Sequence, residues 1–393
     1  MPVAALSPRV NLEQSRKQAK DLLKALKAGD REVLDRIRWN HPRFHRLEDA
    51  EIQKREFVLA DAQLVIARMH YFESWPKLVR HIEALEAEDP RVMRFEAAAD
   101  AIIAGDIPKL RALLEEHPEL IHERSTRAHR APLLHFIAAN GVEDYRQISP
   151  PNAVDVAKVL LDAGAEVDAA TEVYGGGSTA LNLVATSTPP RLAGVQIPLI
   201  DLLLERGAAI DGVRPGDSTV RAALANNCPE AAVALVERGA RVPDVVAAAG
   251  VGRLDLVTHL ADVASKEQLE RALIMGARYG CHEVVAYLLD QEVDVGASDG
   301  MTALHWAAGG GHLDMMKLLI ARGAPLEKKN EYGGTVLDST LWFAYNVRAE
   351  ELARNDYPAV IDTLIAAGAK TDLYPEMQKF IDGVYRRAEQ VSR

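Results

Sequence analysis

The sequence predicts an all-α protein, a solenoid of repeated helix pairs that follows a separate helical N-terminal segment. One unit, residues 299–325, reads as a turn, a short helix, a tight glycine turn, a second helix and a glycine stop. The same ending, an apolar pair, two further residues and then Gly-Ala, recurs at residues 160–165, 203–208, 235–240, 319–324 and 364–369. The composition, 48% hydrophobic and 26% charged, is that of a folded protein.

The first helix of the clearest unit carries a family signature. Thr302 to Ala307 read TALHWA, which matches the Thr-Pro-Leu-His-x-Ala signature of a repeat with a period of about 33 residues. The sequence therefore resembles the ankyrin-repeat family, whose units are helix–turn–helix pairs with hairpin fingertips. Counting back from the recurrent glycines predicts about eight units over residues 94–373, with degenerate first and fifth units.

Three of the predicted units are longer than the period. Their insertions cover residues 141–155, 186–198 and 345–359. The prolines within them cannot continue the first helix, so we expect loops or short extra turns. Insertions of this kind map to loops on one side of a solenoid, often the binding side.

The two ends of the chain do not fit the repeat. Residues 1–93 predict a helical N-terminal domain, with a helix break at Tyr71–Trp75, Ser74 as the N-cap and Pro76 at the first helical position. This segment resembles the helical extension that precedes the repeats in many bacterial ankyrin proteins. Residues 374–393 predict a C-terminal capping helix.

Charge and cysteine content limit the partners and the compartment. The net charge is -11, which disfavours nucleic acid and anionic membranes. There are two cysteines, Cys228 and Cys281, and we interpret both as turn-packing residues in a reducing compartment. The start of the chain lacks the apolar stretch of a signal peptide, and no run is long enough for a membrane helix. We expect a cytoplasmic monomer.

The histidines have structural explanations. His305 and His135 occupy the signature position, where a histidine ties neighbouring turns together by hydrogen bonds. His41 and His45 have metal-like spacing, but Pro42 interrupts a regular helix and no third ligand is near. The sequence therefore predicts no metal site and no cofactor.

Asp338 stands at the signature histidine's position in the last unit, where a carboxylate is costly to bury. It caps the helix, pairs with a cation or faces a ligand. Two fingertips share a pattern, Glu172-Val173-Tyr174-Gly-Gly and Glu331-Tyr332-Gly-Gly, and both belong to units with insertions. A tyrosine beside a carboxylate suits a polyol or a peptide, although shared descent of the two repeats explains the pattern equally well.

The register also predicts where a ligand lies. Two residues just before each inter-helix turn face the concave groove, and in the last three units they are Arg278 and Tyr279, Gly309 and Gly310, and Trp342 and Phe343. The glycine pair indicates either close packing of the turn or a pocket floor between Tyr279 and Trp342. The predicted ligand-binding residues are Tyr174, Arg278, Tyr279, Trp306, Tyr332, Trp342 and Phe343.

Two hypotheses about function follow from the sequence. The first is a scaffold that binds another protein in the concave groove, because a solenoid offers a long surface and no catalytic signature is present. The second is a protein that binds a small polar, carbohydrate-like molecule in the loop-decorated groove. If that protein is an enzyme, it is a hydrolase using groove carboxylates, for which Asp338, Glu331 and Glu172 are weak candidates.

Overall fold

The computed structural model describes residues 11–347, 352, 354–372 and 375–391, which form two compact units, residues 1–235 and 236–393. Among the described residues no β-strand occurs, and the only ladder pairings are isolated bridges such as Thr171 with Ser178 at the turns before first helices. The all-α prediction is confirmed. The first ten residues, where no signal peptide is predicted, and most of residues 348–353 in the third insertion lie outside the described residues.

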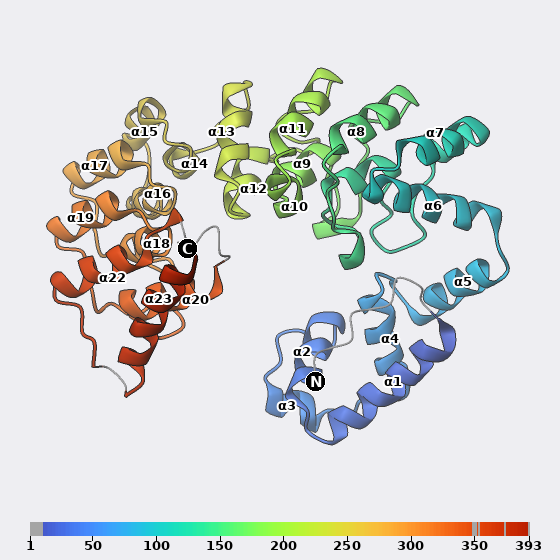
Figure 1. Cartoon of the computed structure of the whole chain (residues 1–393), viewed down its shortest axis with the longest axis horizontal. Coiled ribbons are helices and arrows are strands. Elements are labelled where there is room, and N and C mark those ends of the chain that lie inside the picture. Colours follow the sequence, from blue (N-terminus) through green and yellow to red (C-terminus); the bar gives the residue numbers. More distant parts are fainter. Residues whose placement is uncertain (1–10, 348–351, 353, 373–374, 392–393) are drawn as a thin grey trace. The chain divides into compact units, whose positions relative to one another are not determined.

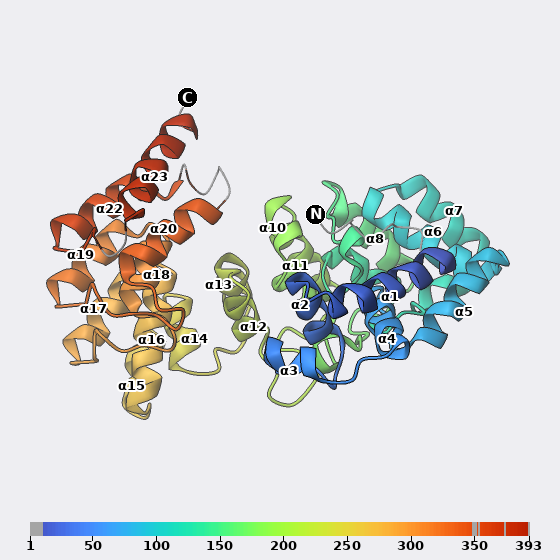
Figure 2. The same cartoon turned by 90° about the horizontal axis from the view of Figure 1, so that it is seen from below.

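The N-terminal part of the first unit is a bundle of short helices: α1 (Leu12–Lys27), α2 (Arg31–Asn40), α3 (Asp49–Lys54), α4 (Leu59–Met69) and α5 (Trp75–Glu86). Asn11 caps α1 by accepting hydrogen bonds from two backbone N–H groups. α1 packs on α4, and the two helices lie side by side in Figure 2. The predicted break before α5 is present, with Ser74 at the N-cap and the helix beginning at Trp75, one residue before Pro76.

The rest of the first unit is a series of helix pairs. The first helices are α6 (Pro90–Ala104), η2 (Leu133–Ala138), α9 (Ala180–Ala185) and α12 (Thr219–Ala225), and their partners are α7 (Ile107–Glu116), α8 (Ala153–Asp162), α11 (Gln196–Glu205) and α13 (Pro229–Glu237). Asp89 caps α6, so the boundary predicted at residue 94 falls inside a helix. The first two insertions form short extra turns, η3 (Asp144–Arg146) and α10 (Thr188–Leu192), as expected from their prolines.

A buried ionic cluster lies where the N-terminal helices meet the first repeats. Arg127 contacts Glu96 at 2.5 Å and Glu143 at 2.6 Å, and Arg146 contacts Glu96 at 2.8 Å. Burial alone would raise the pKa of Glu143, but its hydrogen bond with His129 and the two arginine charges lower this pKa to about 2. The carboxylate of Glu143 is therefore ionised in the folded protein.

The second unit repeats the pairing more regularly. Figure 1 shows two rows, the first helices α14 (Val245–Gly250), α16 (Lys266–Arg278), α18 (Ala303–Gly309) and α20 (Val336–Asn346), and the second helices α15 (Leu254–Ala261), α17 (His282–Asp290), α19 (Leu313–Ala321) and α22 (Tyr357–Ala366). The last helix, α23 (Met377–Val391), packs on α20 and α22.

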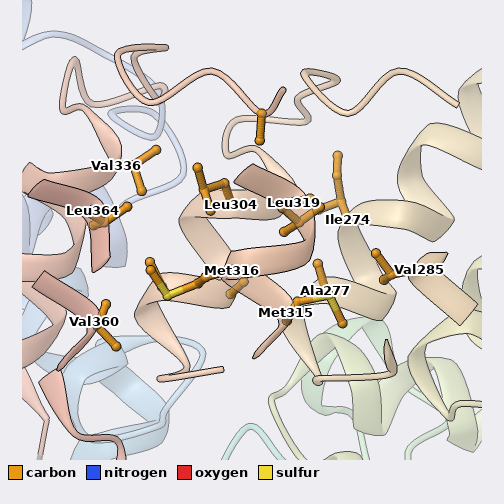
Figure 3. Close-up of a cluster of buried hydrophobic side chains, with 14 of the residues drawn as sticks. Ile274, Ala277, Val285, Leu304, Met315, Met316, Leu319, Val336, Val360 and Leu364 are labelled. Carbon is orange, nitrogen blue, oxygen red and sulfur yellow. The ribbon is translucent and has the colours of Figure 1, made fainter. Parts of the chain in front are cut away.

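One continuous core runs between the two rows of the second unit. Leu304 of α18, Met316 of α19 and Leu364 of α22 are fully buried in it, as Figure 3 shows. α23 contributes the buried residues Met377, Ile381 and Val384 to this core. Each helix pair packs against the neighbouring pairs. The face of the first helices that points away from this core, and the turns before these helices, stay available for binding.

Candidate functional site

The turn before α20 is held by one asparagine. The Asn330 side-chain oxygen accepts hydrogen bonds from the backbone N–H groups of Tyr332 and Gly334, each at 2.9 Å, and its amide donates to Ser339 Oγ at 2.9 Å. The Glu331 N–H donates to the Gly300 carbonyl in the preceding repeat at 2.9 Å. The turn is thus fixed, and it presents the Tyr332 ring, which is 83% exposed.

α20 supplies the other side of a pocket that faces this turn. Trp342 is 60% exposed although its neighbours on the helix, Leu341 and Ala344, are buried in the core. The pocket has a volume of about 590 Å³ and is lined by Met301, Asn330, Tyr332, Gly334, Asp338, Ser339, Trp342 and Phe343. The predicted residues Tyr332, Asp338, Trp342 and Phe343 therefore lie around one cavity.

The remaining predicted residues of this unit extend from the pocket as a row of neighbouring side chains. The Trp342 and Phe343 ring centroids are 5.3 Å apart, and those of Phe343 and Trp306 are 6.2 Å apart. The Arg278 guanidinium lies 4.2 Å from the Trp306 ring centroid and 5.3 Å from that of Tyr279. We call these five residues the aromatic row, and it crosses α20, α18 and the end of α16.

The structure corrects the predicted floor of the pocket. A Cβ at Gly309 would lie 2.6 Å from the Phe343 ring, so that ring already occupies the space above the glycine. A Cβ at Gly310 would lie 2.6 Å from the His312 ring. The two glycines therefore allow close packing of neighbouring side chains, which was the alternative explanation. Tyr279 also does not line the pocket, because it lies at the far end of the aromatic row.

Asp338 has one oxygen engaged and one free. Its Oδ2 accepts hydrogen bonds from the N–H and the hydroxyl of Thr335, both at 2.9 Å, which caps α20. Its Oδ1 is buried without a hydrogen-bond partner. The other candidate carboxylate nearby, Glu331, is exposed beside Gly300 and is not among the residues lining the pocket. Asp338 is therefore the one carboxylate among the described residues that line this pocket.

The first unit holds a second pocket, of about 600 Å³. The Tyr174 hydroxyl donates to Asn140 Oδ1 at 2.8 Å, and the Asn140 amide donates to Thr186 Oγ1 at 3.1 Å. Most of the lining side chains are polar, and they include Gln147, Ser178, Asn182, Thr188, Arg214 and Asp217. Gln147 belongs to the first insertion and Thr188 to the second, so both insertions form part of the pocket wall. Glu172 does not line this pocket.

The two pockets are built on equivalent positions of two repeats. Asn182 and Asp338 occupy the same position in their repeats. Thr186 and Trp342 follow them by four residues and each line a pocket. The fingertip tyrosines, Tyr174 and Tyr332, each line the cavity of their own unit. The shared fingertip pattern thus marks two sites of different chemistry, one polar and one aromatic.

The histidines and cysteines at the turns serve packing. His135 donates to the Ser178 carbonyl of the next turn at 3.2 Å, as predicted. His305 bonds to Thr302 Oγ1 within its own repeat at 2.7 Å, and the Gly334 backbone of the next turn partly offsets the lowering of the His305 pKa by burial. Burial raises the pKa of the Cys281 thiol to about 11, which favours the protonated thiol at neutral pH. Among the described residues no group of three or more His, Cys, Asp or Glu side chains could hold a metal ion.

Comparison with known proteins identifies the class of this fold. The family described as ankyrin repeats (3 copies) matches residues 245–330. The ankyrin repeat and KH domain-containing protein mask-1 of Caenorhabditis elegans is 25% identical over 305 residues, which are 75% of this chain and 11% of that protein. An ankyrin repeat protein of Pyrobaculum aerophilum is 40% identical over 74 residues, 19% of this chain and 28% of the relative.

A further similarity, 34% identity over 91 residues, links 23% of the chain to 3% of the E3 ubiquitin-protein ligase hecd-1 of Caenorhabditis elegans. The chain thus spans less than a third of each of these relatives. Repeated helix pairs, the signature helix and these matches agree, and the chain is an ankyrin-repeat protein. In the described part of the chain no helix is long and apolar enough to cross a membrane.

Proposed function

We propose that this protein is a binding scaffold whose second unit holds a segment of a partner protein along the aromatic row. Ankyrin repeats generally mediate protein–protein interaction. The observation that carries the proposal is the exposure of large aromatic side chains, above all Trp342 and Tyr332, beside a preformed pocket. Tryptophan, tyrosine and arginine dominate the binding energy of protein interfaces, and the aromatic row contains all three types.

The rest of the molecule supports this scaffold. We propose that residues 1–93 form a helical domain that covers the start of the repeat array and that residues 374–393 cover its end. Each end of a solenoid exposes an apolar face unless another element covers it. At the start of the array, the buried Arg127 guanidinium contacts the Phe72 ring, 5.7 Å from the ring centroid. At the end of the array, the apolar side of α23 covers the exposed face.

A screen of a random peptide library displayed on phage tests the scaffold function. We expect peptides enriched on the full chain to lose binding to Trp342→Ala by about thirtyfold or more, the effect of removing an interface hot spot. Val263→Ala is the matched control, because Val263 is 82% exposed in the same unit and does not line the pocket. Equal retention of the enriched peptides by both variants would contradict the proposal.

A second candidate function is the binding of a small polar, carbohydrate-like molecule in the first unit. The observation that favours it is the pocket of about 600 Å³ under Tyr174, lined by amide and hydroxyl groups from several repeats. Thr186→Trp fills this pocket with the side chain that stands at the equivalent position of the second unit. We expect this variant to lose any glycan retained by the full chain on a glycan array, while Trp342→Ala keeps it.

A further inference from the structure

The pocket of the second unit has aromatic walls in two orientations. The rings of Trp342 and Phe343 are inclined at 80° to each other, with centroids 5.3 Å apart, and Tyr332 projects from the braced turn on another side. The face of an aromatic ring carries partial negative charge, so a cation placed between such rings is attracted to each of them. Met301 adds an apolar surface to the lining.

The net charge of the lining is negative. Asp338 is its one ionisable carboxylate, and among the described residues that line the pocket none is cationic. Since Asp338 Oδ1 is buried and lacks a hydrogen-bond partner, the carboxylate is incompletely compensated. A positive charge in the pocket would be attracted to this carboxylate through a medium less polar than water.

Apart from the Tyr332 hydroxyl and Asp338 Oδ1, which is closed to solvent, the oxygen acceptors of the lining side chains are already in use. Asn330 Oδ1 accepts two backbone N–H groups, Ser339 Oγ accepts the Asn330 amide, and Asp338 Oδ2 accepts the Thr335 N–H and hydroxyl. A primary ammonium brings three N–H donors that must each find an acceptor when water is removed. A quaternary ammonium has no N–H donor, so this pocket favours it over lysine.

The preceding repeat already contains a cation packed on an aromatic ring. The Arg278 guanidinium lies 4.2 Å from the Trp306 ring centroid, a geometry typical of a cation–π contact. Trp342 stands one repeat further along the same row, and a ligand would supply the cation there. The row therefore offers a polypeptide a continuous surface, with the pocket at one end.

We infer that this pocket binds a quaternary ammonium group, carried by a trimethylated lysine side chain of the partner segment. The inference rests on the proposed scaffold function and specifies the chemistry of the partner at that site. The aromatic row selects the polypeptide as the source, because Trp306, Arg278 and Tyr279 lie beyond the pocket and would contact residues flanking the modified lysine.

Isothermal titration of the full chain with four probes tests this inference. Three probes are versions of one short acetylated peptide that carry trimethyl-lysine, lysine or the neutral tert-butyl isostere of trimethyl-lysine at the central position. The fourth probe is tetramethylammonium chloride. We expect the trimethyl-lysine peptide to bind about tenfold more tightly than each of the other two peptides. Tetramethylammonium should bind more weakly than the trimethyl-lysine peptide and should compete with it.

Two variants separate the contributions of the rings and of the charge. Trp342→Ala should abolish binding of the trimethyl-lysine peptide, and Val263→Ala should leave it unchanged. Asp338→Asn keeps an oxygen that can cap Thr335 but removes the charge, so it should weaken binding of the charged peptide and leave the neutral isostere unaffected. Helical circular dichroism checks that each variant is folded.

Specific outcomes would overturn the inference. Equal affinity for the charged peptide and its neutral isostere would mean that the pocket recognises shape and not charge. Affinity for tetramethylammonium equal to that for the peptide would assign the site to a free small cation. In either case the scaffold function stands if library peptides still depend on Trp342, whereas peptides that bind independently of Trp342 refute the scaffold function itself.

Discussion

Gly311→Ala is expected to be the most destabilising change in a graded series at the inter-helix turns of the second unit. Gly252, Gly280 and Gly311 occupy the same turn in consecutive repeats, each with φ of +71°. An L-residue in this left-handed region costs about 1–2 kcal/mol relative to glycine. Gly323, with φ of +82° and open space around it, has the same requirement and serves as the control.

The three turns differ in what an added Cβ would meet in the next repeat. The nearest heavy atom is Cys281 Sγ at 3.4 Å for Gly252, the His312 ring at 3.1 Å for Gly280, and the backbone oxygen of Asn355 at 2.5 Å for Gly311. The first distance is ordinary contact, and a side-chain ring can shift by a few tenths of an ångström. A backbone carbonyl moves only with its chain segment, so overpacking adds about 1–3 kcal/mol at Gly311.

We therefore expect a loss of about 2–5 kcal/mol for Gly311→Ala, and about 1–2 kcal/mol for both Gly252→Ala and Gly323→Ala. Gly311→Val should lose more, because its β-branched side chain enlarges the same clash. Urea denaturation of the full chain, followed by far-ultraviolet circular dichroism, measures the shift in transition midpoint. A Gly311→Ala midpoint no lower than that of Gly323→Ala would refute the close approach of Asn355.

Two further predictions concern the first unit. Arg127→Met should lower the free energy of unfolding by about 3–5 kcal/mol in urea denaturation, because it leaves the buried carboxylates of Glu96 and Glu143 with Arg146 as their remaining arginine partner. Adding Glu143→Gln should recover part of the loss, and an unchanged midpoint would count against the cluster. Lowering the pH from 7 to 5 should also destabilise the protein, by roughly 2 kcal/mol per group, because burial lowers the pKa to about 4 for each of His70, His81 and His135. These histidines are neutral in the folded protein and protonate near pH 6.5 in the unfolded chain, so stability is lost as the pH falls from 6.5 towards 4. His81→Gln should weaken the dependence of the urea midpoint on pH. A midpoint that does not change with pH would contradict this prediction.

The predictions from sequence succeeded where a local rule applies. Glycine endings, N-cap residues and prolines determine backbone conformation within one turn, so helix pairs and the extra turns in the insertions were predictable. The Tyr332 fingertip and the exposed position of Trp342 followed from the same register, because a residue's face on a helix depends on its own spacing. The capping role of Asp338 was one of three readings that the sequence left open.

Tertiary packing decided the rest, because it depends on residues far apart in the chain. Phe343 fills the space above Gly309, a contact that the glycine pair alone could not distinguish from an open floor. The polar pocket of the first unit joins Asn140, Thr186 and Arg214 from separate repeats, which come together only when the repeats pack against one another. A local signal fixes the path of the backbone, whereas a cavity is the space left after side chains from several repeats have packed against one another.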